Sequence, residues 1–175
     1  MKGCIMKRFI FLCLSLMVAL PVVAADNQIE VLGSFDDWSA FSYKDEAGLV
    51  CYMATEPTKS QGKYSRRDDV FLIITHRPND KTYDVVNVVA GYTYRPASKP
   101  TMTIDNNKSV NLVVHNNTAW GKDEKVDEDL VNQMKKGSRA LLKGTSARGT
   151  LTTDTFSLKG FSKAYQLINK ACGRE

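Results

Sequence analysis

Histidine and cysteine, the residues that build most transition-metal and redox sites, are scarce in this chain. Its 175 residues include two histidines and four cysteines. His76 and His115 do not stand at metal-ligand spacing from each other or from a cysteine, and the sequence contains no CxxC or HExxH motif. The sequence therefore predicts no metal site and no bound cofactor.

Nucleotide-binding and nucleophile motifs are also missing. The segment Gly144–Thr150 has the glycine spacing of a phosphate-binding loop, but Thr150 stands where the lysine is required and no long helix follows. The segment is not a GxSxG nucleophile elbow either. We interpret it as a turn between two strands and predict no catalytic residues. The alternative is an exported hydrolase in which Ser146 or Thr145 meets His76 and an aspartate in space, since such a triad is defined by geometry.

A concentrated basic surface, which nucleic-acid binding requires, is absent. The chain has 24 basic and 19 acidic residues, and three of the basic residues lie in the first 25 positions. The remainder carries 21 basic against 19 acidic residues. The one local basic pair, Arg66-Arg67, is followed by Asp68-Asp69. We therefore predict no nucleic-acid partner.

The sequence has one long apolar run, and it lies at the N-terminus. Three basic residues precede the apolar stretch Phe9–Leu20, and small residues follow up to Ala25. This order is typical of a secretory signal peptide, with cleavage after Ala25 or, nearly as well, after Ala24. The run is short for a membrane-spanning helix, so an uncleaved anchor is the less favoured alternative. We predict a signal peptide over 1–25 and one exported domain over 26–175, with no stable membrane insertion after cleavage.

Strand signals dominate the predicted domain. Short apolar runs are separated by turn residues at the spacing typical of antiparallel folds. One run, VFLIITHR, is apolar on both of its faces, which predicts a strand buried on both sides. The predicted strands are Trp38–Tyr43, Leu49–Thr55, Val70–Arg77, Val85–Tyr94, Thr101–Ile104, Val110–His115, Arg139–Thr145 and Thr150–Leu158.

Two short helices are expected near the end of the chain. Asp127 is a suitable N-cap, and Gly137 a suitable stop, for the first helix. Apolar residues recur at helical spacing along Phe161–Cys172, which predicts the second. Alternating βαβ units are absent. We therefore predict a mainly β fold, an antiparallel β-sandwich or barrel of about eight strands with two short helices, the second at the C-terminus.

Two cysteines remain once the predicted signal is removed. Cys51 falls on the apolar face of an early strand, and Cys172 falls on the apolar stripe of the last helix. Two lone cysteines in an oxidising compartment usually pair, so we expect one disulfide between them. The alternative is two buried free thiols.

The segment Glu56–Asp69 is polar and basic, contains Pro57 and Gly62, and is predicted to be a long loop. Because β scaffolds present recognition residues on loops, it is the candidate interaction surface. The candidate contact residues are Lys59, Lys63, Tyr64, Arg66 and Arg67. We expect deletion of Lys59–Arg67 to leave folding intact.

An ordered set of short motifs runs from about residue 35 to residue 172. The motifs are Trp38, Cys51-Tyr52, Pro57, Thr75-His76-Arg77-Pro78, Ala90-Gly91-Tyr92, Ala119-Trp120, Met134-Lys135-Lys136-Gly137, the stretch from Lys143 to Thr150, the stretch from Thr155 to Phe161, and Ala171-Cys172. Together they resemble the invasion-associated locus B family.

The resemblance implies a small exported protein of Gram-negative bacteria, periplasmic or surface-associated, with an unknown envelope or host protein as its partner. No catalytic residue is carried over from this family. The resulting hypothesis is an exported, non-catalytic binding or interaction protein of the periplasm or envelope, linked to host-cell invasion in pathogenic relatives. Cys51 and Cys172 both belong to this motif set. Longer members of the family carry additional cysteines near the first tryptophan, and none lies near Trp38 here, so the resemblance is to a shorter branch with one bridge.

Overall fold

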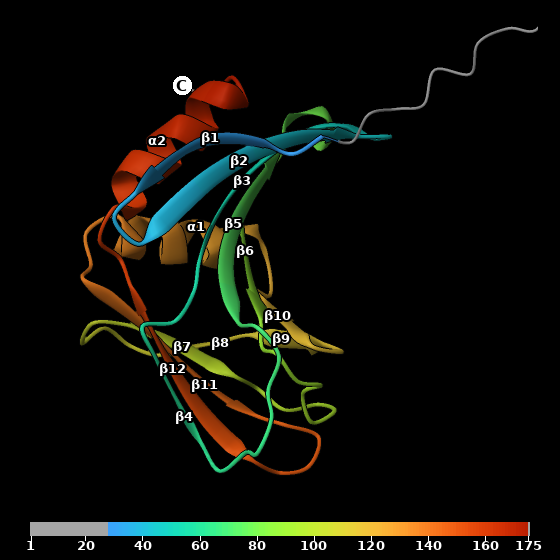
Figure 1. Cartoon of the computed structure of the whole chain (residues 1–175), viewed down its shortest axis with the longest axis vertical. Helices are drawn as coiled ribbons and strands as arrows, with labels where there is room; N and C mark the ends of the chain where they lie inside the picture. The colour runs from blue at the N-terminus through green and yellow to red at the C-terminus, as the bar shows by residue number, and fades with distance from the viewer. Residues whose placement is uncertain (1–27, 175) are drawn as a thin grey trace, which may run out of the picture.

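The computed structural model describes residues 28–174, which form two antiparallel β-sheets and two α-helices (Figure 1). The prediction of a mainly β antiparallel fold with two helices is confirmed, and the arrangement is sandwich-like rather than a closed barrel. The predicted signal segment 1–25 lies outside the described residues. Within 28–174, no helix is both long and apolar enough to cross a membrane.

The larger sheet has seven strands in the order β1-β2-β3-β5-β6-β10-β9, and every neighbouring pair is antiparallel. Its strands are β1 (Glu30–Phe35), β2 (Trp38–Asp45), β3 (Gly48–Thr55), β5 (Phe71–Arg77), β6 (Thr82–Val89), β10 (Thr118–Trp120) and β9 (Val113–His115). The short 3-10 helix η1 (Pro78–Asp80) joins β5 to β6.

The smaller sheet has five strands in the order β4-β12-β11-β7-β8. Its strands are β4 (Lys59–Gly62), β12 (Leu151–Ser157), β11 (Arg139–Thr145), β7 (Thr101–Ile104) and β8 (Val110–Asn111). The predicted run Val110–His115 is therefore not one strand. It divides at the buried Leu112, so that β8 belongs to the smaller sheet and β9 to the larger one.

Helix α1 (Glu124–Met134) lies where the two sheets meet and contacts β6 and β7 (Figure 1). It begins one turn earlier than predicted. Its N-cap is Asp123, whose side chain accepts a hydrogen bond from the Val126 N–H at 3.0 Å. Asp127, the predicted cap, lies inside the first turn and is buried. The preference of caps for aspartate does not separate two aspartates one turn apart.

Helix α2 (Phe161–Ala171) covers β1, β2 and β3 on the inner side of the larger sheet (Figure 1). Its predicted apolar stripe is confirmed, and the ring of Phe161 meets Trp38 edge-on with 4.9 Å between centroids. Gly160, at its N-cap, has φ 89°, and a Cβ there would lie 1.9 Å from the Phe35 carbonyl oxygen. Only glycine allows this approach of helix to strand.

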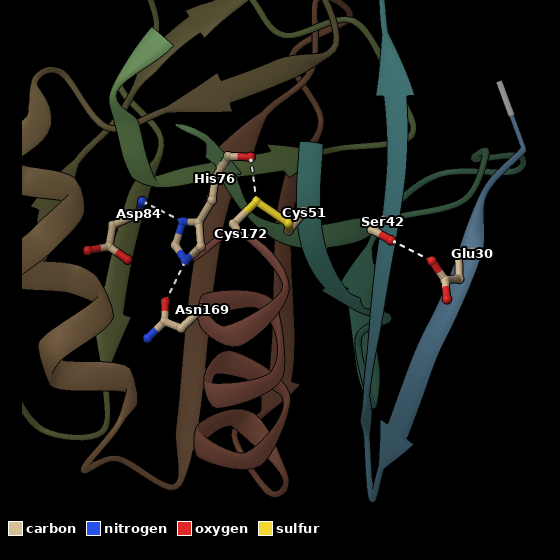
Figure 2. The surroundings of a disulfide bond; sticks show 7 residues. All are labelled: Glu30, Ser42, Cys51, His76, Asp84, Asn169 and Cys172. Carbon is tan, nitrogen blue, oxygen red and sulfur yellow. Dashed lines mark hydrogen bonds between the residues drawn. A yellow bond between two sulfur atoms is a disulfide. The ribbon is translucent and has the colours of Figure 1, made fainter. Parts of the chain in front are cut away.

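The disulfide joins Cys51 on β3 to Cys172 at the end of α2, across 121 positions of sequence (Figure 2). The predicted pairing is confirmed, and the alternative of two free thiols is excluded in this structure. Both cysteines are buried, and the Cα–Cα distance is 5.9 Å. The bridge therefore fixes the C-terminal helix to the middle of the larger sheet.

Strand β5 is covered less completely than its sequence predicts. Leu72, Ile74 and His76 on one face are fully buried, whereas Phe71 and Ile73 on the other face are partly exposed. The apolar sequence of this strand therefore does not require a second layer over its outer face, because partly exposed apolar side chains are common on protein surfaces.

Candidate functional site

A pocket of about 740 Å³ opens between three segments that are far apart in sequence. The first is the loop 63–68 that follows β4, which we call the pocket loop. The second is the segment 91–93 that follows β6, and the third runs from the turn after β11 into β12. The pocket residues are Lys63, Tyr64, Ser65, Arg66, Arg67, Asp68, Gly91, Tyr92, Thr93, Ser146, Ala147, Arg148, Thr150 and Thr152.

The pocket loop is held against Gly91 by backbone contacts. The N–H of Asp68 donates to the Gly91 carbonyl oxygen at 3.1 Å. Gly91 has φ 68°, and a Cβ on it would lie 2.1 Å from the Asp68 carbonyl oxygen. This close backbone packing at Gly91 ends the predicted strand Val85–Tyr94 early, at Val89.

A buried ion pair fastens the same loop to β12. The guanidinium of Arg67 binds the carboxylate of Asp154 through two hydrogen bonds of 2.7 Å each, and its Nε donates to the Ala90 carbonyl oxygen at 2.7 Å. The two side chains are 5% and 0% exposed. A two-point arginine–carboxylate pair fixes orientation as well as distance, so the loop has one position relative to the smaller sheet.

Two tyrosines enclose this guanidinium. The rings of Tyr64 and Tyr92 lie 5.5 and 4.8 Å from the Arg67 Cζ, measured to their centroids. The hydroxyl of Tyr92 is hydrogen-bonded to the Thr152 hydroxyl at 2.6 Å, and burial raises the pKa of Tyr92 above its usual value. The wall of the pocket is therefore rigid, and the positive charge of Arg67 is already balanced.

The turn after β11 forms the opposite wall. The Ser146 N–H donates to the Thr150 carbonyl oxygen at 2.9 Å, and the Thr150 N–H donates to the Ser146 hydroxyl at 3.1 Å. Gly149 has φ 87°, and the Arg95 guanidinium lies 2.7 Å from where its Cβ would be. The interpretation of this segment as a strand-to-strand turn is confirmed.

His76 lies in a separate polar network beside the disulfide (Figure 2). Its Nδ1 accepts a hydrogen bond from the Asp84 N–H at 3.0 Å, and its Nε2 is 2.8 Å from the Asn169 amide oxygen. The proton must therefore be on Nε2. The ring is fully buried, and this burial lowers the pKa of His76. Both ring nitrogens are engaged, so the imidazole is a neutral structural group.

The carboxylate of Asp84 closes this network. It accepts a hydrogen bond from the Tyr165 hydroxyl at 2.7 Å and pairs with the Arg174 guanidinium at 2.6 Å. Burial raises the pKa of Tyr165, which keeps the phenol protonated as the donor. The network thus fixes the last residues of the chain to β5 and β6.

The structure does not join His76 to Ser146. His76 lies on β5 of the larger sheet, whereas Ser146 lies in the turn after β11 of the smaller sheet. Each has its own partners: Asp84 and Asn169 for the histidine, and Thr150 for the serine. Thr145 is at the end of β11, also in the smaller sheet. No described contact supports a nucleophile–base pair from these residues.

Comparison with known families identifies the chain. The family described as invasion associated locus B (IalB) protein matches residues 38–169. The chain belongs to this family. Membership of the IalB family fits an exported protein that is, at the level of the family, associated with invasion. Comparisons with curated proteins and with solved structures gave no match.

In this IalB protein the five predicted contact residues have different positions. Lys63, Tyr64 and Arg66 line the pocket. Lys59 lies on the exposed strand β4, which pairs with β12, so the predicted loop is partly a strand. Arg67 is a buried wall residue rather than an exposed contact. We therefore now expect deletion of Lys59–Arg67 to impair folding, because the deletion removes β4 and leaves a buried carboxylate without its cation.

Other pocket residues were not predicted as contacts. Arg148 follows Ser146 in the turn that the sequence did indicate, and its basic charge at an exposed turn was the available signal. The pairing of Arg67 with Asp154 joins residues 87 positions apart and had no local signature. Among residues 28–174 there is no group of three or more His, Cys, Asp or Glu side chains arranged to hold a metal ion.

Proposed function

We propose that this protein is an exported, non-catalytic binding module of the periplasm or cell envelope, and that the pocket between the pocket loop and the turn after β11 is its binding site. The observation that carries the proposal is the convergence of Lys63, Arg66 and Arg148 on one pocket. In the described part of the chain, none of the three is within ion-pair distance of a carboxylate.

The construction of the pocket supports a binding role. The loop and the turn that form it are fixed by the Arg67–Asp154 pair, by the close approach at Gly91 and by the hydrogen bonds within the turn. A rigid site loses little conformational entropy when a ligand binds. A loop with only a structural role would not require three basic side chains without carboxylate partners around one pocket.

The family and the disulfide support the proposed compartment. IalB membership fits export, and a bridge such as Cys51–Cys172 persists in oxidising compartments. Fractionation of cells expressing the full-length chain should place the product in the periplasm. Recovery in the cytoplasm with reduced cysteines would contradict the proposal. Digestion by protease added to intact cells would instead place it on the cell surface.

A charge-matched pair of double variants tests the site. Arg66→Gln with Arg148→Gln removes two basic groups from the pocket, and Lys125→Gln with Lys163→Gln removes two from exposed helix positions. We expect the pocket variant to lose retention of material from a solubilised native envelope fraction, while the helix variant retains it. Equal retention by both variants would refute the site.

A further inference from the structure

The charge of the pocket is positive and largely uncompensated. Its basic residues are Lys63, Arg66, Arg67 and Arg148, and Asp68 is its one acidic residue. The charge of Arg67 is cancelled by Asp154 beneath the surface. The other three basic groups have no carboxylate partner among residues 28–174, so the natural complement of the pocket is an anion.

The lining is rich in hydroxyl groups. Ser65, Thr93, Ser146 and Thr150 contribute them, whereas the apolar lining is confined to Ala147 and the faces of two tyrosine rings. Small-molecule pockets are ordinarily lined mostly by apolar side chains. A lining of this kind favours a ligand that carries many hydrogen-bonding groups and disfavours an acyl chain or an apolar peptide.

One aromatic ring remains open to such a ligand. Tyr64 contacts the Arg67 guanidinium and is still 38% exposed. An aromatic ring has a negative face that attracts positively polarised C–H groups, such as those on one face of a pyranose. The pocket volume of about 740 Å³ lies in the usual range for small-molecule sites, about 300–1,000 Å³.

We propose that the pocket binds an acidic saccharide, a pyranose that carries a carboxylate or phosphate group. Arg66 and Arg148 bind the anionic group, Tyr64 packs against the sugar ring, and the hydroxyl lining binds the sugar hydroxyls. The planar guanidinium matches both carboxylate and phosphate with two parallel hydrogen bonds. This inference rests on the proposed function, since it names the ligand class of the same site.

The test is an NMR titration of the product of the full-length chain, isolated from the periplasm. The probes are glucuronate, glucose 6-phosphate, inorganic phosphate and neutral glucose. At least one acidic sugar should shift the amides of 63–68, 91–93 and 146–152, with an affinity about tenfold above that of glucose and above that of inorganic phosphate. The two acidic sugars separate a carboxylate source from a phosphate source.

The variants complete the test. Arg66→Gln with Arg148→Gln should weaken binding of the acidic sugar by about tenfold or more, and Lys125→Gln with Lys163→Gln should leave it unchanged. Binding of glucose as tight as that of both acidic sugars, or no shift of pocket amides by any sugar, would overturn the ligand class. If envelope retention still depends on Arg66 and Arg148 in that case, the proposed function stands and only the ligand class is rejected. If neither sugar binding nor envelope retention depends on these two residues, both proposals are rejected.

Discussion

The buried ion pair between Arg67 and Asp154 allows a direct test of how the pocket is held. Arg67→Met keeps a long side chain but removes the cation and all three hydrogen bonds, and leaves a carboxylate that is 0% exposed without a counter-charge. Breaking a buried pair in this way costs about 3–5 kcal/mol. For a domain of this length the corresponding fall in Tm is about 6–20 °C.

Urea unfolding followed by circular dichroism, with the disulfide intact, measures this loss. Arg66→Met is the matched control, because Arg66 is the exposed neighbour in the same loop, and it should change the free energy of unfolding by less than about 0.5 kcal/mol. Arg67→Lys keeps the charge but not the two-point geometry, so its cost should fall between those of the two methionine variants.

A double variant separates the charge from the packing. Arg67→Met with Asp154→Leu removes both charges, so the double variant should be more stable than Arg67→Met alone. The reasoning is refuted if Arg67→Met lies within about 1 kcal/mol of the wild type. It is also refuted if the losses in free energy of unfolding of Arg67→Met alone and of Asp154→Leu alone add up to the loss in the double variant, since the two partners would then not interact.

Three further predictions concern the rest of the fold. Replacing Cys51 and Cys172 together by serine should lower the free energy of unfolding in urea by about 2–5 kcal/mol, and unchanged stability would show that the bridge does not stabilise the fold. Burial raises the pKa of Asp127 to about 7, against about 3.9 in an unfolded chain, so between those values the folded state keeps a proton that the unfolded state has released. The stability of the wild type relative to Asp127→Asn should therefore fall as pH rises from 4 to 7, and a constant difference between the two proteins would contradict this. Gly91→Ala should lower the free energy of unfolding more than Gly173→Ala does, by about 1 kcal/mol or more. Both glycines have positive φ, but an added Cβ meets a backbone oxygen only at Gly91. Equal losses of stability in the two variants would show that the close contact is unimportant.

The sequence was informative where the pattern is local. Period-two alternation placed β3, β11 and β12 closely, and the helical stripe placed α2 and put Cys172 on its buried side. It missed β1 and β4, which lie at sheet edges, and the three-residue strand β10 (Thr118–Trp120), which lies between β6 and β9. Edge strands are short or polar and carry little hydrophobic periodicity, as the KSQG sequence of β4 shows.

The sequence was least informative where two distant segments determine each other's environment. Arg66 and Arg67 are adjacent and chemically identical, and both line the pocket, yet only Arg67 pairs with a buried carboxylate, that of Asp154. That difference is set by a residue on β12 and by the register of β4 against it, which local pattern does not encode. The proximity of the pocket loop to Arg148 has the same origin, so the pocket loop could be predicted from the sequence, but its assembly with the other two segments of the pocket could not.

The position of the disulfide in the chain also orders events in time. Cys172 lies 121 positions after Cys51, so its thiol reaches an oxidising compartment long after that of Cys51 when the chain is exported from its N-terminal side. Cys51 must then remain unpaired until the last helix arrives. Oxidation of this pair therefore cannot occur before the chain has been exported as far as Cys172, so the completed bridge shows that the segment from Cys51 to Cys172 has reached the oxidising compartment.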